Sequence, residues 1–260
     1  MKKTCAVIQM DIACGQPELN RKKVEEKTAQ AAERKPDFIL LPELWDTGYD
    51  LKRLHEIADD YGRKNKAFLR HLAKKYQVNI IGGSVSNREQ NGTYNTLYAF
   101  DKQGNLIGEY RKAHLFRLMD EEKYLLAGND ICQFHIDNLP CAAVICYDIR
   151  FPEWVRKSIL QGAQILFVPA EWPGTRLSHW RHLLISRAIE NQCYVIACNR
   201  VGRDPNNTFA GHSLVIDPWG EIIAEAGEQE EILYAEIDLS SVQEARTFIP
   251  VFEDRRPEIY

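Results

Sequence analysis

Short apolar runs, many of them rich in β-branched residues, alternate with amphipathic charged segments along the whole chain, and this alternation limits the fold more than any other feature. Runs such as residues 38–41 and 165–168 are apolar on both faces of a strand, which is typical of strands that are covered on both sides. The sequence therefore predicts an α/β fold. We expect strands at residues 5–10, 37–41, 79–84, 97–100, 141–146, 165–168, 194–198, 212–216 and 232–237, and helices at residues 18–34, 51–61, 66–76, 152–161 and 179–191.

Turn residues and the absence of a linker support a single domain. Residues 101–105 and 217–221 carry the Asp and Gly residues of hairpin turns. No low-complexity tract or solenoid repeat interrupts the pattern. We expect one domain over residues 1–240, followed by a polar tail over 241–260 that carries Pro250 and Pro257 and contacts a second subunit.

Composition excludes several classes of protein. A formal net charge of −4 argues against a nucleic-acid binder, and no apolar run is long enough for a membrane span. The first residues indicate a strand and not a signal peptide. Seven scattered cysteines without a paired Cys-x-x-Cys argue against a disulfide framework and a zinc site, and they favour a reducing, cytoplasmic location.

Three segments carry residues suited to catalysis, and each follows or ends a short apolar run. Glu43 lies in residues 40–45, Lys112 in residues 108–116, and Cys146 in residues 142–153. The ends of strands are where α/β folds carry reactive groups. Taken singly, Glu43 fits a surface carboxylate, Lys112 a surface lysine, and His114 a structural histidine.

Cys146 has the most specific context. An apolar strand ends at this residue, and a helix is expected to begin at Pro152, a residue that suits the first helical turn. This arrangement resembles a nucleophile elbow with cysteine in place of serine, so that the N–H of Tyr147 can face an oxyanion. A buried strand cysteine is the alternative, and the Asp148 and Arg150 that follow argue against it.

Together, Glu43, Lys112 and Cys146 in their local contexts resemble the nitrilase superfamily of carbon–nitrogen hydrolases, over residues 5 to about 238. Residues 82–84, 186–192, 199–202 and 211–213 also match. The resemblance implies a Glu–Lys–Cys triad on a four-layer α-β-β-α sandwich that pairs into dimers. It also implies a second glutamate seven residues before a glycine, which is Glu121 here, with Glu122 beside it as the alternative.

The chemistry that the resemblance implies needs no metal and no organic cofactor. Cys146 attacks an amide carbon, and Glu43 takes the thiol proton and later passes it to the leaving ammonia. Glu43 then activates water against the thioester. Lys112 and the Tyr147 N–H stabilise the oxyanion.

The segment 146–153 resembles the ω-amidase branch, whose members hydrolyse the terminal amide of 2-oxo acids such as 2-oxoglutaramate. Residues 170–176, followed by His179 and Trp180, resemble bacterial members linked to methionine salvage. Arg150 is the candidate that binds the carboxylate of the substrate, and a salt bridge with Asp148 or Glu153 is the alternative. Tyr49, six residues after Glu43, offers a further hydroxyl.

Two other functions stay open at this point. An N-carbamoyl-amino-acid amidase or a nitrilase would use the same triad and differ only in its pocket. A catalytically silent binding protein on the same fold is the alternative of another class, and the intact Glu43, Lys112 and Cys146 argue against it. We expect a small-molecule amide as the substrate and a homodimer or larger homo-oligomer as the assembly.

Overall fold

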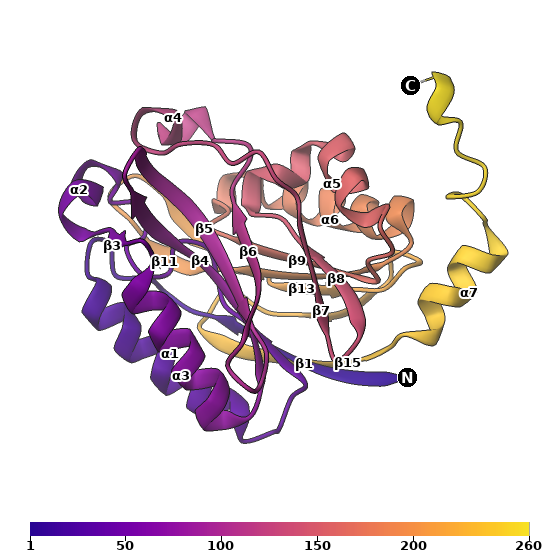
Figure 1. The fold of residues 1–260 in the computed structure, drawn as a ribbon, viewed down its shortest axis with the longest axis horizontal. Coiled ribbons are helices and arrows are strands. Elements are labelled where there is room, and N and C mark those ends of the chain that lie inside the picture. The colour runs from indigo at the N-terminus through magenta and orange to yellow at the C-terminus, as the bar shows by residue number, and fades with distance from the viewer. Residues whose placement is uncertain (260) are drawn as a thin grey trace.

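The computed structural model describes residues 1–259 and contains two large β-sheets that pack face to face between helices (Figure 1). The first sheet has the order β15 (Glu231–Asp238), β1 (Lys2–Gln9), β2 (Phe38–Leu40), β4 (Asn79–Glu89), β5 (Gly92–Phe100) and β6 (Leu106–Arg111), with β3 (Asp59–Asp60) beside β4. The second has the order β14 (Ile222–Glu225), β13 (Leu214–Ile216), β10 (Tyr194–Asn199), β9 (Ile165–Ala170), β8 (Leu139–Ala143) and β7 (Cys132–Ile136). A small ribbon pairs β11 (Val201–Arg203) with β12 (Thr208–Ala210).

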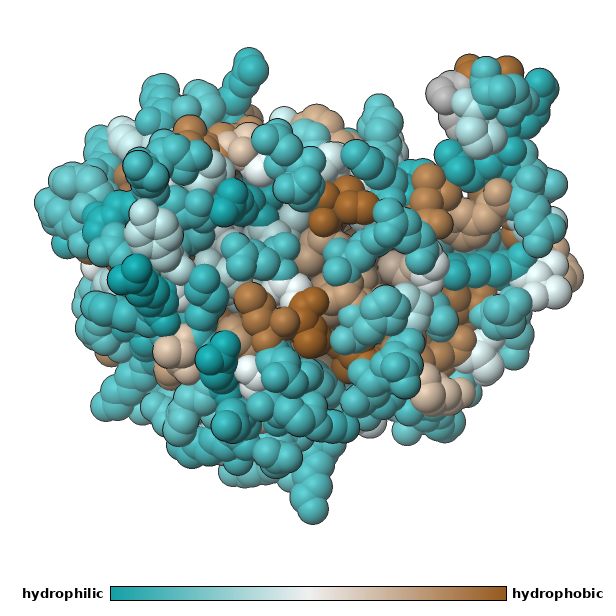
Figure 2. Space-filling model, viewed as in Figure 1, coloured by the Kyte–Doolittle hydropathy of each residue, from teal (hydrophilic) through white to brown (hydrophobic). Residues whose placement is uncertain are grey.

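Helices cover the outer face of each sheet, which gives the four layers that the resemblance implied. On one side, α1 (Pro17–Ala32) packs on β1, and α3 (Arg63–Tyr76) packs on β4 and β5. On the other side, α5 (Pro152–Ile159) packs on β8, and α6 (Leu177–Asn191) packs on β10 and β13. Figure 2 shows one face of this body as mostly hydrophilic, with separate hydrophobic patches near its middle and toward α7.

The doubly apolar strands are explained by this sandwich. Phe38 and Leu40 point between the two sheets, where the Phe38 ring meets Phe167 of β9 at a centroid distance of 5.4 Å. Ile39 points the other way, into the core beneath α1 and α3. Because successive strand residues face opposite sides, a strand that is buried on both faces needs apolar residues at every position.

The structure confirms the expected strands and most of the helices, with shifts of a few residues at their ends. Both hairpin turns are confirmed by their closing hydrogen bonds, from Gly104 N to Asp101 O at 2.8 Å and from Gly220 N to Asp217 O at 3.0 Å. The strands β6, β7, β11, β12 and β14 were not among the predicted elements.

The helix predicted at residues 51–61 is wrong in its second half. Only a 3-10 turn, η1 (Leu51–Arg53), and the short α2 (Leu54–Ile57) form, and Ala58 then takes an extended conformation. The chain turns outward because Asp59 and Asp60 pair with β4 as β3. The Asp59 carboxylate also accepts the N–H of Lys64 at 3.2 Å and of Asn65 at 2.8 Å, and so caps the start of α3.

The strand predicted at residues 141–146 ends earlier than expected. β8 stops at Ala143, and Cys146 begins the 3-10 helix η3 (Cys146–Arg150). The segment after residue 240 is partly helical: α7 (Ser240–Phe248) buries Val242 and Ala245. Beyond α7, Phe252 packs at the edge of the core, with the Arg156 guanidinium 5.1 Å from its ring centre, and the C-terminal end lies apart from the sheets (Figure 1). Within residues 1–259, no helix is long and apolar enough to cross a membrane.

Candidate active site

Glu43 lies in a loop that leaves β2 and is held against β4 by a close backbone approach. Gly83 has φ of +57°, and a Cβ atom there would lie 1.9 Å from the carbonyl oxygen of Pro42, so that only glycine fits. Ser84 Oγ accepts the N–H of Leu44 at 2.9 Å. Residues 82–84, which also resemble the family, therefore pack against the Glu43 loop and hold it in place.

Lys112 follows the edge strand β6 and reaches the same point from the other side. Its backbone N–H donates to Asn95 O of β5 at 2.9 Å, and this bond fixes the position of the Lys112 backbone from which the side chain extends. The ammonium donates to Glu43 Oε1 at 2.8 Å and to Glu121 Oε1 at 2.7 Å. All three charged side chains are fully buried. An ammonium has three protons, so one remains for another acceptor.

The structure places Glu121, and not its neighbour Glu122, beside Lys112. Glu121 begins the short helix α4 (Glu121–Tyr124) and is fully buried, whereas Glu122 is exposed. The second carboxylate oxygen of Glu121 accepts the N–H of Phe116 at 2.8 Å. This second contact orients the carboxylate toward Lys112.

Further donors hold Glu43 from the remaining directions. Asn95 Nδ2 donates to its Oε1 at 2.8 Å, and the N–H of Glu171 donates to its Oε2 at 2.8 Å. The Tyr49 hydroxyl lies 3.2 Å from Glu43 Oε1 and 2.5 Å from Glu121 Oε1. A hydroxyl has only one proton to donate, and the shorter distance assigns it to Glu121.

The charges of this cluster compensate one another. Burial alone would lower the pKa of Lys112, but the carboxylates of Glu121 and Glu43 outweigh it and raise that pKa well above its usual range. Burial raises the pKa of Glu121, and the charge of Glu43 adds to the rise, while Lys112 opposes it. Burial and the two carboxylates also raise the pKa of Tyr49, which keeps its hydroxyl a neutral donor.

Cys146 is held at a strained turn next to this cluster. Its φ is +46°, which is uncommon for a residue with a side chain. The buried Asp148 fixes the turn by accepting the N–H of Ile145 at 2.9 Å, the Tyr110 hydroxyl at 2.7 Å and the N–H of His114 at 2.9 Å. His114 is therefore a structural residue, as predicted. The strand–turn–helix geometry is that of a nucleophile elbow.

The Cys146 thiol is neutral in the resting site. Burial, followed by the charge of Glu43, raises its pKa well above the usual range, and Lys112 opposes the shift. Burial also raises the pKa of the other six cysteines, and all seven are free thiols. Cys146 differs from them because its thiol forms a hydrogen bond with the Glu43 carboxylate.

Cys146 opens into a narrow cleft, which is lined by Phe116, Cys146, Tyr147, Arg150, Glu171, Trp172, Pro173 and Arg176. The Arg150 guanidinium lies 4.6 Å from the Trp172 ring centre, and its nitrogens lie 3.4 and 3.5 Å from His179 Nδ1. It forms no ion pair with a carboxylate among residues 1–259, so the predicted alternative of a salt bridge with Asp148 or Glu153 is wrong. Asp148 already holds the turn.

Sequence reasoning missed two residues that touch Glu43. Asn95 lies in the polar first half of β5, which was not predicted as a strand. Glu171 follows the buried strand β9 just as Glu43 follows β2. This shared position could have identified Glu171 from the sequence. Its carboxylate pairs with Arg200 at 2.7 Å, both side chains are fully buried, and burial raises the pKa of Glu171 to about 8.

The arrangement places a thiol, a carboxylate and an ammonium next to one another, and these are groups that can carry out acyl transfer. Within residues 1–259, no group of three or more His, Cys, Asp or Glu side chains is placed to hold a metal ion.

Comparison with known proteins agrees with this site. The carbon–nitrogen hydrolase family model matches residues 4–247. The chain is 53% identical to the 2-oxoglutaramate amidase of Bacillus subtilis over the full length of both proteins. It is 34% identical to the human omega-amidase NIT2, over 89% of this chain and 87% of that protein. The crystal structure of a carbon–nitrogen hydrolase from Helicobacter pylori G27 superimposes with a TM-score of 0.93 at 29% identity, over 100% of this chain and 97% of that one.

A family match over nearly the whole chain, and relatives above 30% identity, establish membership. The four-layer fold and the cluster of buried Glu, Lys and Cys side chains had pointed to the same family. The chain belongs to the carbon–nitrogen hydrolase family, the nitrilase superfamily, and is an amidase.

Proposed function

We propose that the protein hydrolyses the terminal amide of a small 2-oxo acid such as 2-oxoglutaramate, through a thioester on Cys146 and with release of ammonia. The observation that carries this proposal is the buried ammonium of Lys112 between Glu43 and Glu121, beside Cys146 in a cavity that also contains the Arg150 guanidinium. The 53% identity to a protein named 2-oxoglutaramate amidase supports the choice of substrate.

In the first half of the reaction, Cys146 Sγ attacks the amide carbon while its proton passes to Glu43. Because burial and the Glu43 carboxylate raise the pKa of the thiol, the attack needs Glu43 as the base that removes its proton. The oxyanion accepts hydrogen bonds from the remaining N–H of the Lys112 ammonium and from the backbone N–H of Tyr147. Tyr147 lies in the first turn of η3, where N–H groups have no partner inside the helix.

In the second half, Glu43 returns the proton to the amide nitrogen, the C–N bond breaks, and ammonia leaves a thioester. Glu43 then removes a proton from water, which attacks the thioester carbon. The C–S bond breaks, Cys146 regains its proton, and the product acid leaves. Glu121 and Tyr49 keep Lys112 in place through both halves.

Specificity in this proposal comes from Arg150. A guanidinium offers paired donors that match a carboxylate, and the Arg150 side chain has no carboxylate partner among the described residues. Arg150 and Cys146 line the same narrow cleft, so a substrate whose amide lies at Cys146 would place its other end near Arg150. We propose that Arg150 binds that carboxylate.

One panel of substrates tests the proposed function. Ammonia release is measured with 2-oxoglutaramate, 2-oxosuccinamate, N-carbamoyl amino acids, aliphatic amides and nitriles. We expect the highest kcat/KM with the 2-oxo acid amides. A preference for N-carbamoyl amino acids or nitriles would contradict the substrate assignment, and no turnover of any compound would favour a silent binding protein.

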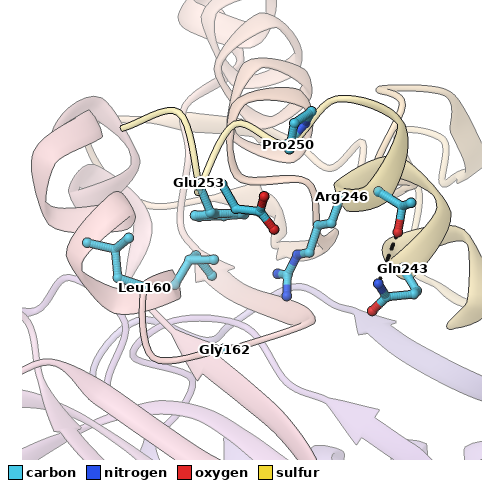
Figure 3. A pocket seen from close by; sticks show the side chains of 9 residues that line it. Leu160, Gly162, Gln243, Arg246, Pro250 and Glu253 are labelled. Atoms are coloured by element: carbon cyan, nitrogen blue, oxygen red, sulfur yellow. Dashed lines mark hydrogen bonds between the residues drawn. The ribbon is translucent and has the colours of Figure 1, made fainter. Parts of the chain in front are cut away.

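We also propose that the protein is a homodimer that uses the chain after residue 240. A hollow of about 670 Å³ lies between the end of α5 and α7 with the segment that follows it (Figure 3). Phe248 is 78% exposed and Ile249 48% exposed beside it. Exposed apolar residues of this size mark interaction sites. Light scattering should give a dimer mass for the wild type and a monomer mass for Phe248→Glu, and a monomeric wild type would refute the idea.

Two proposals about biological context follow from the sequence resemblance. Seven free thiols suit a reducing cytoplasm, and fractionation of cells should find the protein there. A role in methionine salvage would consume the amide that remains when glutamine donates its amino group to a 2-oxo acid. A deletion strain should then accumulate 2-oxoglutaramate during growth that depends on salvage, and unchanged levels would argue against this role.

A further inference from the structure

Two arginine side chains, and not one, line the cavity of Cys146. Arg150 ends the 3-10 helix η3, and Arg176 ends the 3-10 helix η4 (Gly174–Arg176). Neither guanidinium forms an ion pair with a carboxylate among residues 1–259. Of the residues that line the cavity, only Glu171 carries a carboxylate, and its Oε2 is already bound by Arg200. The cavity therefore holds two cations whose charge no neighbouring anion neutralises.

Aromatic side chains hold both arginines in place. The Arg150 guanidinium lies 4.6 Å from the centre of the Trp172 ring, and the Arg176 guanidinium lies 5.3 Å from the centre of the Phe116 ring. The indole N–H of Trp172 donates to the backbone carbonyl of Arg176 at 2.8 Å. Trp172 thus supports one arginine through its ring and the backbone of the other through its N–H. These contacts already restrict the two guanidinium groups. Less conformational entropy is therefore lost when they bind a ligand.

The two cations are close enough to repel each other. Burial lowers the pKa of Arg150, and the positive charge of Arg176 lowers it further. Like charges in a partly buried cavity destabilise the empty site, and an anion placed between them relieves that repulsion. This arrangement favours a ligand with more than one acceptor oxygen at the end away from Cys146.

We propose that Arg176 is a second substrate-binding residue, and that it and Arg150 together bind the carboxylate and the 2-oxo oxygen of a 2-oxo acid amide. The inference rests on the proposed function and makes the selectivity of that site explicit. A 2-oxo acid presents three oxygen acceptors on adjacent carbons, which two guanidinium groups can share. The corresponding 2-amino acid amide, L-glutamine, carries an ammonium on the same carbon, and two cations would repel it.

The test compares Arg176→Gln and Arg176→Lys with the wild type, with Arg117→Gln as the matched control. Arg117 is an exposed arginine next to Phe116 that does not line the cavity. The substrates are 2-oxoglutaramate, glutaramate (which lacks the 2-oxo group), L-glutamine and butyramide. Circular dichroism checks that each variant is folded.

We expect Arg176→Gln to lower kcat/KM for 2-oxoglutaramate by about 10- to 100-fold, the range for loss of a hydrogen bond to a charged group. The loss should appear mainly in KM. Glutaramate should lose less, butyramide should change less than about twofold, and the preference for 2-oxoglutaramate over L-glutamine should narrow. Arg176→Lys should recover part of the loss, and Arg117→Gln should match the wild type.

Two outcomes separate this inference from the proposal beneath it. If the wild type hydrolyses 2-oxoglutaramate well, and Arg176→Gln either keeps its kcat/KM or loses activity equally on butyramide, the role of Arg176 is refuted while the proposed function stands. If the wild type hydrolyses other amides but not 2-oxoglutaramate, the proposed function fails, and the inference fails with it.

Discussion

Replacing Lys112 with methionine removes a buried charge and keeps an unbranched side chain that is one heavy atom shorter. In the wild type the ammonium lies 2.8 Å from Glu43 and 2.7 Å from Glu121, and all three side chains are fully buried. Removal of one oxyanion donor costs about 100- to 1,000-fold in kcat. Lys112→Met also leaves two carboxylates facing each other, which favours protonation of one of them and weakens the base. We therefore expect a loss of kcat of about 1,000-fold or more.

The same substitution should make stability depend on pH. Removing one partner of a buried ion pair costs about 3–5 kcal/mol of unfolding free energy. The pKa of Glu121 is already raised in the wild type, and without Lys112 burial and the charge of Glu43 raise it further above the unfolded value. Groups with a raised folded pKa stabilise the fold below the unfolded pKa, and that contribution is lost as pH rises through the folded pKa. The loss of unfolding free energy in Lys112→Met, relative to the wild type, should therefore be larger at pH 8 than at pH 5.5.

Urea unfolding followed by circular dichroism, at both pH values and one protein concentration, measures this deficit. Lys123→Met is the matched control, because the Lys123 ammonium pairs with Asp120 at the surface, where the two side chains are 60% and 56% exposed. It should cost less than about 1 kcal/mol and leave kcat unchanged. Near wild-type kcat in Lys112→Met, or a stability loss no greater than that of Lys123→Met, would refute the reasoning.

Four further single substitutions address other parts of the site. Glu43→Gln should lower kcat by about 100- to 10,000-fold, the usual range for a general base, and should slow alkylation of the active-site thiol by iodoacetamide; a folded variant with wild-type kcat would contradict its role. Glu121→Gln should lower kcat/KM by about 100-fold through misplacement of the neighbouring ammonium, and Tyr49→Phe should cost less; equal losses in both would contradict the assignment of the hydroxyl proton to Glu121. Arg200→Met should lower the unfolding free energy by about 3–5 kcal/mol in urea because it leaves the Glu171 carboxylate buried without its partner, and the double variant with Glu171→Gln should recover part of that loss; wild-type stability of the single variant would show that the pair matters little.

The candidate catalytic cluster could be predicted from the sequence because local patterns mark its three main members. Glu43 and Cys146 lie just beyond buried strands, and Lys112 lies just beyond a hairpin. The polar strand β6, which precedes Lys112, escaped prediction because it lies at the edge of its sheet and lacks a continuous apolar run. The motif therefore located Lys112 even though its strand was not recognised.

The contacts around the cluster were not accessible in the same way. Glu43 accepts hydrogen bonds from Asn95 and from the N–H of Glu171, which lie 52 and 128 residues away in the sequence. No local sequence pattern predicts contacts between residues so far apart in the chain. The choice between Glu121 and Glu122 depends on which side chain the short helix α4 turns inward. Motif spacing favoured Glu121, and burial in the folded chain confirms that placement.

The mistaken helix at residues 51–61 has a comparable cause. Its apolar spacing suits a helix, but Asp59 gains backbone donors from α3 and pairs with β4. These tertiary contacts outweigh local propensity, which differs by only about 0.7 kcal/mol per residue among ordinary residues.

Intact-protein mass spectrometry after rapid acid quenching tests the central claim most directly. Wild-type protein mixed with 2-oxoglutaramate should show a covalent adduct whose mass equals the substrate minus ammonia, and peptide mapping should place the adduct on Cys146. The adduct should be labile to hydroxylamine, as a thioester is. Cys146→Ala should remain folded, release no ammonia and form no adduct. Substantial ammonia release by Cys146→Ala, or an adduct on any of the other six cysteines in place of Cys146, would contradict the account.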